Sequence, residues 1–247
     1  MELVFPENEF EIFSPPGTLK IADNFYCDQT EITNISWKEY KHWTKRKFGE
    51  TSKEYKTCLP DTTVFNNVSS FGEPYLPNYF THPAYNNYPV VGVSKQQIEN
   101  YTQWRTNRVI EVLLIGSGFI TSEQLDSIDI SNFLERPEVK EKIKMVPVYR
   151  LPTKVEFDEI LTLYNFTFET ALVGMQSTDF SKKQREALAG LHSNANEIFT
   201  DTVIGNYPFA FPENFIILNR KAEINAWTSF RNVCSWGTLE EYLEMFE

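Results

Sequence analysis

Hydrophobic residues recur at helical spacing in four parts of the chain, and each part opens with the same polar signal. A Ser or Thr is followed three residues later by Glu or Gln, a pairing that bonds two free backbone N–H groups at a helix N-terminus. The apolar residues that follow give each segment one buried face, which predicts an amphipathic helix. The four predicted helix starts are Ser36/Glu39, Ser94/Gln97, Thr153/Glu156 and Thr238/Glu241.

Shorter extended segments and loops lie between the predicted helices. The predicted strands, all brief apolar or alternating runs, are residues 19–22, 25–29, 215–218 and 230–236. Residues 60–89 and 205–212 are rich in Pro and Asn and are predicted loops. Because helices and strands follow one another without βαβ regularity, the predicted fold class is α+β. The length suits one domain or two small ones, and we predict a single domain over residues 1–247.

The composition is that of a folded globular protein. Hydrophobic residues make up 41% of the 247 positions and charged residues 23%, a mixture that argues against a disordered or coiled-coil chain. Aromatic residues reach 15%, and they bury large areas, so we expect a core built from rings. Trp37, Tyr40 and Trp43 fall at helical spacing, which favours a core stripe over an exposed sugar-binding platform.

The net charge of the chain excludes some classes of binding partner. A net charge of -11 argues against nucleic acid and against an anionic membrane surface, because an acidic protein repels both. The longest apolar run, residues 112–115, is far short of the roughly 20 residues of a membrane span, so none is expected. The first 16 residues lack the basic and apolar regions of a signal peptide. We therefore expect a cytoplasmic protein if Met1 is the native start, and an exported one if a signal segment has been removed.

The cysteines form no familiar metal or redox motif. Cys27, Cys58 and Cys234 are widely spaced, and the chain has no Cys-x-x-Cys pair for a zinc ribbon or a thioredoxin-like site. Buried thiols are the favoured interpretation, because Cys is among the residues most often found buried.

Five segments, in a fixed order, resemble the formylglycine-generating enzyme family, also called sulfatase-modifying factor domains. They are FYCDQTEITN (25–34), PVVGVS with Tyr101 and Trp104 (89–104), YRLPTKVEFD (149–158), residues 190–201, and SFRNV (229–233). The YRLPT sequence is the sharpest of these similarities. The resemblance implies a formylglycine-generating-enzyme-like (C-type-lectin-like) mixed fold with short strands and long loops. Against that pattern, residues 109–148 look like an insertion with two helical pieces around Pro137.

Arg150 and Glu156, both in the YRLPT segment, are interpreted as structural residues. Pro152 stiffens the start of the predicted helix and Thr153 caps it, so capping explains the whole segment. We expect Arg150 to reach an acid, either Glu156 or Glu31, and to fix the helix start through an ion pair.

The resemblance also implies a structural calcium ion in residues 194–201. Asn194 and Glu197 would donate side-chain oxygens, the ligand type that Ca²⁺ prefers. The residues by themselves favour the other interpretation, a polar turn closed by hydrogen bonds of its Asn side chains.

The cysteine positions depart from the family pattern and bear on activity. The resemblance implies that family oxidases bind copper through two nearby cysteines that precede a GFR-like segment. Here Cys234 is the only cysteine in the last part of the chain, and it follows the SFR sequence at residues 229–231. We therefore expect no copper and no catalytic residues. The predicted function is that of a divergent sulfatase-modifying-factor-like domain without oxidase activity, acting as a binding or assembly module.

An oxidoreductase of the formylglycine-generating type, acting on a peptide cysteine, is the alternative function. Residues 194–197 are closer to the matching loop of gliding-motility lipoproteins, a family branch that looks structural. The predicted partner is a protein or peptide. Carbohydrate binding follows only from the lectin-like topology, and fold analogy carries little functional weight.

Overall fold

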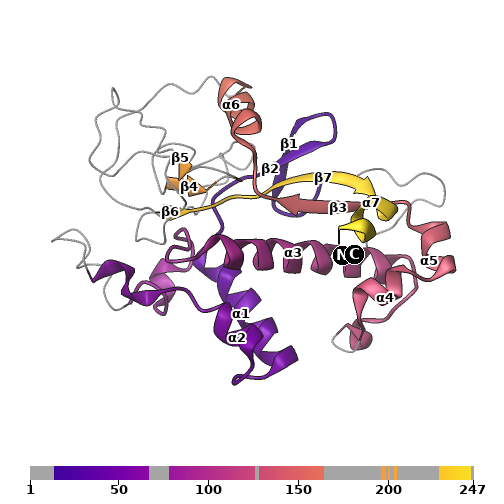
Figure 1. The fold of residues 1–247 in the computed structure, drawn as a ribbon, viewed down its shortest axis with the longest axis horizontal. Helices are drawn as coiled ribbons and strands as arrows, with labels where there is room; N and C mark the ends of the chain where they lie inside the picture. Colours follow the sequence, from indigo (N-terminus) through magenta and orange to yellow (C-terminus); the bar gives the residue numbers. More distant parts are fainter. Residues whose placement is uncertain are drawn as a thin grey trace.

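The computed structural model describes residues 14–66, 78–125, 128–163, 196–198, 200, 203–204 and 228–245 of the chain. Helices and short strands mix in these residues, in agreement with the α+β prediction (Figure 1). The strands are β1 (Thr18–Ala22), β2 (Phe25–Asp28), β3 (Met145–Arg150), β4 (Asn196–Ile198), β5 (Val203–Ile204), β6 (Thr228–Ser229) and β7 (Val233–Thr238). The α-helices are α1 (Asn34–Phe48), α2 (Lys53–Thr57), α3 (Lys95–Gly116), α4 (Ile130–Leu134), α5 (Pro137–Lys142), α6 (Lys154–Leu163) and α7 (Leu239–Glu244). Short 3-10 helices are η1 (Thr62–Phe65), η2 (Pro83–Tyr85) and η3 (Ser122–Gln124).

Four strands form the main sheet, in the order β1-β2-β7-β3, and every neighbouring pair is antiparallel. The sequence patterns did not predict β3, whose interior contains Pro147. Proline cannot donate to a sheet and is confined mainly to edge strands, and β3 lies at an edge. A second sheet has the order β5-β4-β6.

The main sheet lies between two helices, with α3 on one face and α6 on the other (Figure 1). Tyr26, Cys234 and Tyr149 form one row across β2, β7 and β3 and belong to the apolar cluster that includes α3. Cys27 and Val233 form the next row and belong to the cluster that includes α6. Successive side chains of a strand point to opposite faces, so the sheet buries both.

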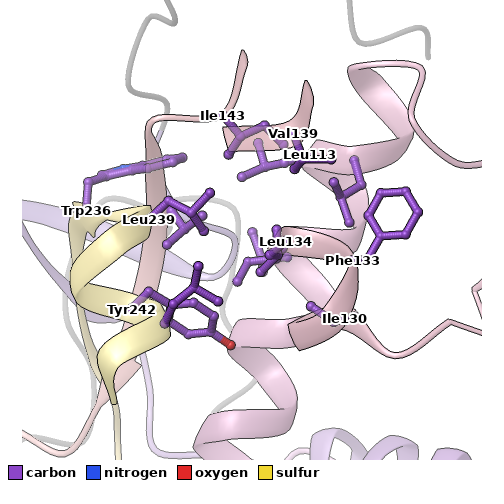
Figure 2. Close-up of a cluster of buried hydrophobic side chains, with 14 of the residues drawn as sticks. Leu113, Ile130, Phe133, Leu134, Val139, Ile143, Trp236, Leu239 and Tyr242 are labelled. Atoms are coloured by element: carbon purple, nitrogen blue, oxygen red, sulfur yellow. The ribbon is translucent and has the colours of Figure 1, made fainter. Parts of the chain in front are cut away.

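The largest apolar cluster lies where α4, α5 and α7 meet α3 and the sheet (Figure 2). Its labelled members are Leu113, Ile130, Phe133, Leu134, Val139, Ile143, Trp236, Leu239 and Tyr242. Full burial of one large apolar side chain contributes about 1.5–3 kcal/mol. The cluster therefore ties the C-terminal helix α7 to the segment that contains α4 and α5.

A second cluster joins α1 to α3 through aromatic rings. Trp37 stacks on Tyr101 with ring centroids 5.2 Å apart, and its indole N–H donates to the Cys58 carbonyl at 2.9 Å. Phe230 packs edge-on against both rings. Trp37 and Tyr40 are buried, which confirms the core interpretation for the first two residues of the predicted stripe.

Three of the four predicted helix starts are confirmed. Ser94 and Thr238 cap α3 and α7, and in each case the partner three residues later completes the reciprocal pairing. Thr153 and Glu156 bond each other's backbone N–H groups at the start of α6. These signals are local, so the sequence alone is enough to find them.

The start of α1 corrects the prediction at Ser36. Thr33 is the N-cap, and its hydroxyl accepts the Ser36 N–H at 3.3 Å. The N–H groups of residues 34–35 donate to the carbonyls of Tyr88 and Asn86, both at 2.8 Å. Because a distant loop satisfies these two donors, the helix begins earlier than its local pattern indicates.

The segment predicted as an insertion, residues 109–148, begins inside α3 and ends inside β3. The two helical pieces expected around Pro137 are α4 and α5, and Pro137 is the first residue of α5. The predicted loop and strand at residues 205–212 and 215–218 lie outside the described residues. In the part of the chain that the structure describes, no helix is long and apolar enough to span a membrane.

Candidate functional site: a buried charge cluster and the adjoining cavity

A buried group of charges lies where β2 ends against α3. Arg105 donates from both terminal nitrogens to the Asp28 carboxylate, each at 2.7 Å, and also to the Pro16 carbonyl at 2.8 Å. The Asp28 side chain is 4% exposed and the Arg105 side chain 15%. Two parallel bonds between a guanidinium and a carboxylate fix their orientation, and removing one partner of a buried pair is strongly destabilising.

A second ion pair adjoins the first. Arg231 and Glu31 are both fully buried, with 3.9 Å between their nearest charged atoms. Arg231 also donates to the backbone carbonyl of Asp28 at 3.3 Å. The two pairs therefore hold the same turn of chain after β2, one from α3 and one from the segment before β7.

Asn232 links this turn to α3. Its backbone N–H donates to the Asp28 carboxylate at 2.9 Å, and its side-chain oxygen accepts the Thr102 hydroxyl at 3.2 Å. Across the described ranges, the Asn232 side-chain nitrogen and the Ser229 hydroxyl are buried without a hydrogen-bond partner. Buried polar atoms without partners are uncommon. The hydrogen-bonding capacity of the cluster is therefore not fully used by the described residues.

Arg105 keeps its charge despite its surroundings. Burial disfavours the charged form, but the Asp28 carboxylate outweighs this effect and raises the pKa of Arg105. The guanidinium lies 4.1 Å from the centre of the Tyr149 ring. Burial raises the pKa of Tyr149, whose hydroxyl stays neutral and donates to the Pro16 carbonyl at 3.0 Å. Acid–base catalysis needs a pKa near the working pH, so these groups suit a fixed architectural role better than proton transfer.

A cavity of about 260 Å³ opens beside the charge cluster, between α1 and α3. Its wall combines charged, hydroxyl and aromatic side chains, among them Asp28, Glu31, Ser36, Glu39, Trp104 and Arg105. The charge cluster therefore forms part of a surface that a small ligand or a single side chain can reach.

The structure brings the predicted pair Arg150 and Glu156 together. Two bonds of 2.8 and 2.5 Å join them, and Glu156 also accepts the Thr153 N–H at 2.9 Å. Burial works against the charge on Glu156, but the Arg150 and Thr153 bonds prevail and lower its pKa to about 2. The Arg150 side chain is 39% exposed and that of Glu156 22%, so the pair is only half-buried. Glu31, the other acid considered for Arg150, pairs with Arg231 instead.

The three cysteines lie in three different apolar clusters. Cys27 and Cys234 are on neighbouring strands, but Cys27 pairs with Val233 and Cys234 pairs with Tyr26. Adjacent rows point to opposite faces of a sheet, so the two thiols face away from each other. Burial raises the pKa of Cys58 and of Cys234, which keeps both in the thiol form at neutral pH.

The predicted calcium ligands are only partly within the described residues. Asn194 lies outside them. Glu197 lies in β4, and its backbone pairs with Ile204 of β5 and with Ser229 of β6. This pairing brings one resemblance segment beside the SFR sequence of another. Among the described side chains, no group of three or more His, Cys, Asp or Glu is arranged to hold a metal ion.

Comparison with protein families agrees with the resemblance. The family profile described as "Sulfatase-modifying factor enzyme 1-like domain" matches residues 2–161, about two thirds of the chain. The chain belongs to the sulfatase-modifying factor family. No curated protein and no solved structure gives a significant match.

The range that matches the sulfatase-modifying factor family contains most of the site. Asp28, Glu31 and Arg105 fall within residues 2–161, whereas Arg231 and Asn232 fall beyond it. Strand β7 also lies beyond the matched range, yet it pairs with both β2 and β3. Residues outside the match therefore complete both the main sheet and the charge cluster of this sulfatase-modifying factor domain.

Sequence reasoning missed most of the cluster as a site. Asp28, Glu31 and Arg231 all occur in segments that carried the resemblance, so charged residues in those segments were a usable signal. Arg105 had no such signal, because its partner is 77 positions away in the chain. The cavity beside them leaves no trace in the sequence.

Proposed function

We propose that this chain is a divergent sulfatase-modifying factor domain without oxidase activity, which acts as a binding or assembly module for a protein or peptide partner. The observation that carries the proposal is the position of Cys27 and Cys234 on opposite faces of the main sheet. Soft thiolate ligands select Cu(I), and both thiolates of a pair would have to reach the same ion. To bring the two thiols to the same face, one strand would have to turn over. Its buried apolar side chains would then move to the other face of the sheet.

Cys58 is no substitute for the missing second ligand. It lies in the aromatic cluster of α1 and α3, away from the sheet clusters of the other two cysteines. Its thiol donates to the Tyr55 carbonyl at 3.0 Å. Metal binding requires the thiolate form, and burial raises the pKa of this thiol.

Anaerobic titration with Cu(I) tests the proposal. We expect no tight 1:1 complex, and the same weak response from the wild-type chain, Cys27→Ala and Cys234→Ala. Cys58→Ala is the control for the loss of one thiol outside the sheet. Tight 1:1 binding that Cys234→Ala abolishes would overturn the proposal in favour of the alternative, an oxidoreductase acting on a peptide cysteine. Oxidation of a cysteine-containing peptide by the copper-loaded protein would lead to the same conclusion.

We also propose a structural calcium ion in residues 194–201, with Asn194 and Glu197 among its ligands. The proposal is supported by the oxygen ligands that these residues offer and by the net charge of -11, which favours a cation. A polar turn remains the alternative.

Thermal unfolding in millimolar calcium and in chelator distinguishes these alternatives. Calcium at about 100 times its dissociation constant adds about 2.7 kcal/mol to the stability of a native state that binds it. We expect a higher melting temperature in calcium, and we expect Glu197→Gln to remove the increase while Glu99→Gln, on α3, keeps it. Coincident melting curves in calcium and chelator would overturn the calcium proposal and leave Glu197 as a structural residue.

A further inference from the structure

The cavity between α1 and α3 has the size and the chemistry of a site for one small polar group. Its volume of about 260 Å³ lies just below the range of about 300–1,000 Å³ that is typical of pockets for drug-sized ligands. The residues that line it include the aromatic residues Tyr101 and Trp104 and the polar residues Ser36 and Glu39. A side chain or a molecule of similar size fits such a space.

Most charges around the cavity are already balanced. Asp28 pairs with Arg105, and Glu31 pairs with Arg231. Arg108 on α3, which also lines the cavity, pairs with Glu111. Each of these pairs has no net charge, so none of them favours an anionic or a cationic ligand by itself.

Glu39 is the exception among the acids of the wall. It projects from α1, is exposed, and has no ion pair or hydrogen bond within the described ranges of the chain. Among the described residues of the wall, Glu39 therefore adds one uncompensated negative charge on the solvent side of the cavity. The net charge of -11 for the whole chain adds to the attraction for a cation.

The aromatic rings favour the same kind of ligand. A cation within about 6 Å of a ring centre is attracted by the negative face of the ring, most strongly for Trp. The chain already uses this contact nearby, because the Arg108 guanidinium lies 4.4 Å from the centre of the Trp43 ring. Trp104 is half-buried and lines the cavity together with Glu39.

We propose that this cavity binds an alkylammonium group, supplied by a lysine side chain of a peptide partner and held between the Glu39 carboxylate and the Trp104 ring. The inference rests on the proposed function, of which it specifies the partner chemistry. A lysine suits the site because its charge is compact and its long apolar stem can lie along the rings while its backbone stays outside. The exposed position of Glu39 leaves that side open to a peptide chain.

Calorimetric titration with three probes tests the inference. The probes are N-acetyl-lysine methylamide, a short neutral peptide with a single lysine, and the same peptide with that lysine acetylated. We expect saturable 1:1 binding of the first two and none of the third, because acetylation removes the charge. Glu39→Gln should weaken binding about tenfold, the loss of one charge-assisted contact. The matched control Glu99→Gln removes an exposed acid of α3 that does not line the cavity and should bind as the wild type does.

The possible outcomes test the binding site, the peptide as the source of the lysine, and the proposed function separately. Equal weakening by Glu39→Gln and Glu99→Gln would overturn the inference, because only long-range attraction would then be at work. Absence of saturable binding for every probe would also overturn it. Binding of the lysine methylamide without binding of the peptide would overturn the peptide source. The copper titration is read on different variants, so its result does not depend on this one.

Discussion

Two ion pairs of this chain differ in both sequence distance and burial. Arg150 and Glu156 are 6 positions apart, and both side chains are partly exposed at the start of α6. Asp28 and Arg105 are 77 positions apart and are only 4% and 15% exposed, where β2 meets α3. The first pair can be predicted from the sequence because both residues belong to the capping pattern at the start of one helix. The second pair joins a strand to a helix. It holds two distant segments together, but no local sequence pattern predicts it.

Arg105→Ala is expected to give the largest loss of stability. It leaves the buried Asp28 carboxylate without its cation, and breaking a buried pair in this way costs about 3–5 kcal/mol. Urea unfolding followed by tryptophan fluorescence measures the free energy of unfolding. Arg105→Lys is the matched control, because it keeps the charge but loses the parallel bonds, and it should lie between the wild type and Arg105→Ala. A loss below about 1 kcal/mol for Arg105→Ala, the value typical of surface pairs, would remove the contrast between the two ion pairs.

The same contrast explains which parts of the fold the sequence could predict. The caps at Ser94, Thr153 and Thr238 depend on partners three residues away, and the structure confirms all three. The predicted cap at Ser36 is wrong, because the N-cap of α1 is Thr33. The first N–H groups of this helix bond to carbonyls of Asn86 and Tyr88, which are distant in the sequence. Local chemistry is visible in the sequence, whereas chemistry between distant segments depends on the fold itself.

Strand β3 and the charge cluster illustrate the second case. β3 contains Pro147, which argues against a strand until the sheet order places it at an edge. Arg231 reaches Glu31 only because β7 pairs with β2. No spacing along the chain relates these residues. Their positions follow from the sheet topology, which the sequence patterns did not specify.

Arg150→Ala should cost much less than Arg105→Ala. The side chain of Arg150 is 39% exposed, and pairs accessible to solvent typically contribute about 0.2–1 kcal/mol. Glu156 would still accept the Thr153 N–H, so the start of α6 remains capped. The same urea experiment measures the effect, and Lys154→Ala, which breaks an exposed pair with Asp158, is the control for a surface interaction. A loss as large as that of Arg105→Ala would show that burial does not separate the two pairs.

The smallest expected effect is a dependence of the Arg150–Glu156 contribution on pH. The pKa of Glu156 falls from its ordinary value of 4.5 to about 2 in the folded chain, against the effect of burial and because of its bonds to Arg150 and Thr153. A lowered folded-state pKa means that the ionised carboxylate stabilises the fold above pH 4.5 and loses this contribution as the pH falls toward 2. The difference in unfolding free energy between the wild type and Arg150→Ala should therefore be constant above pH ~5 and should shrink below it. Comparing the two chains at each pH cancels the titration of every acid that they share. If the difference were the same at pH ~3 as at neutral pH, the contribution of Arg150 would come from packing of its side chain rather than from the charge of Glu156.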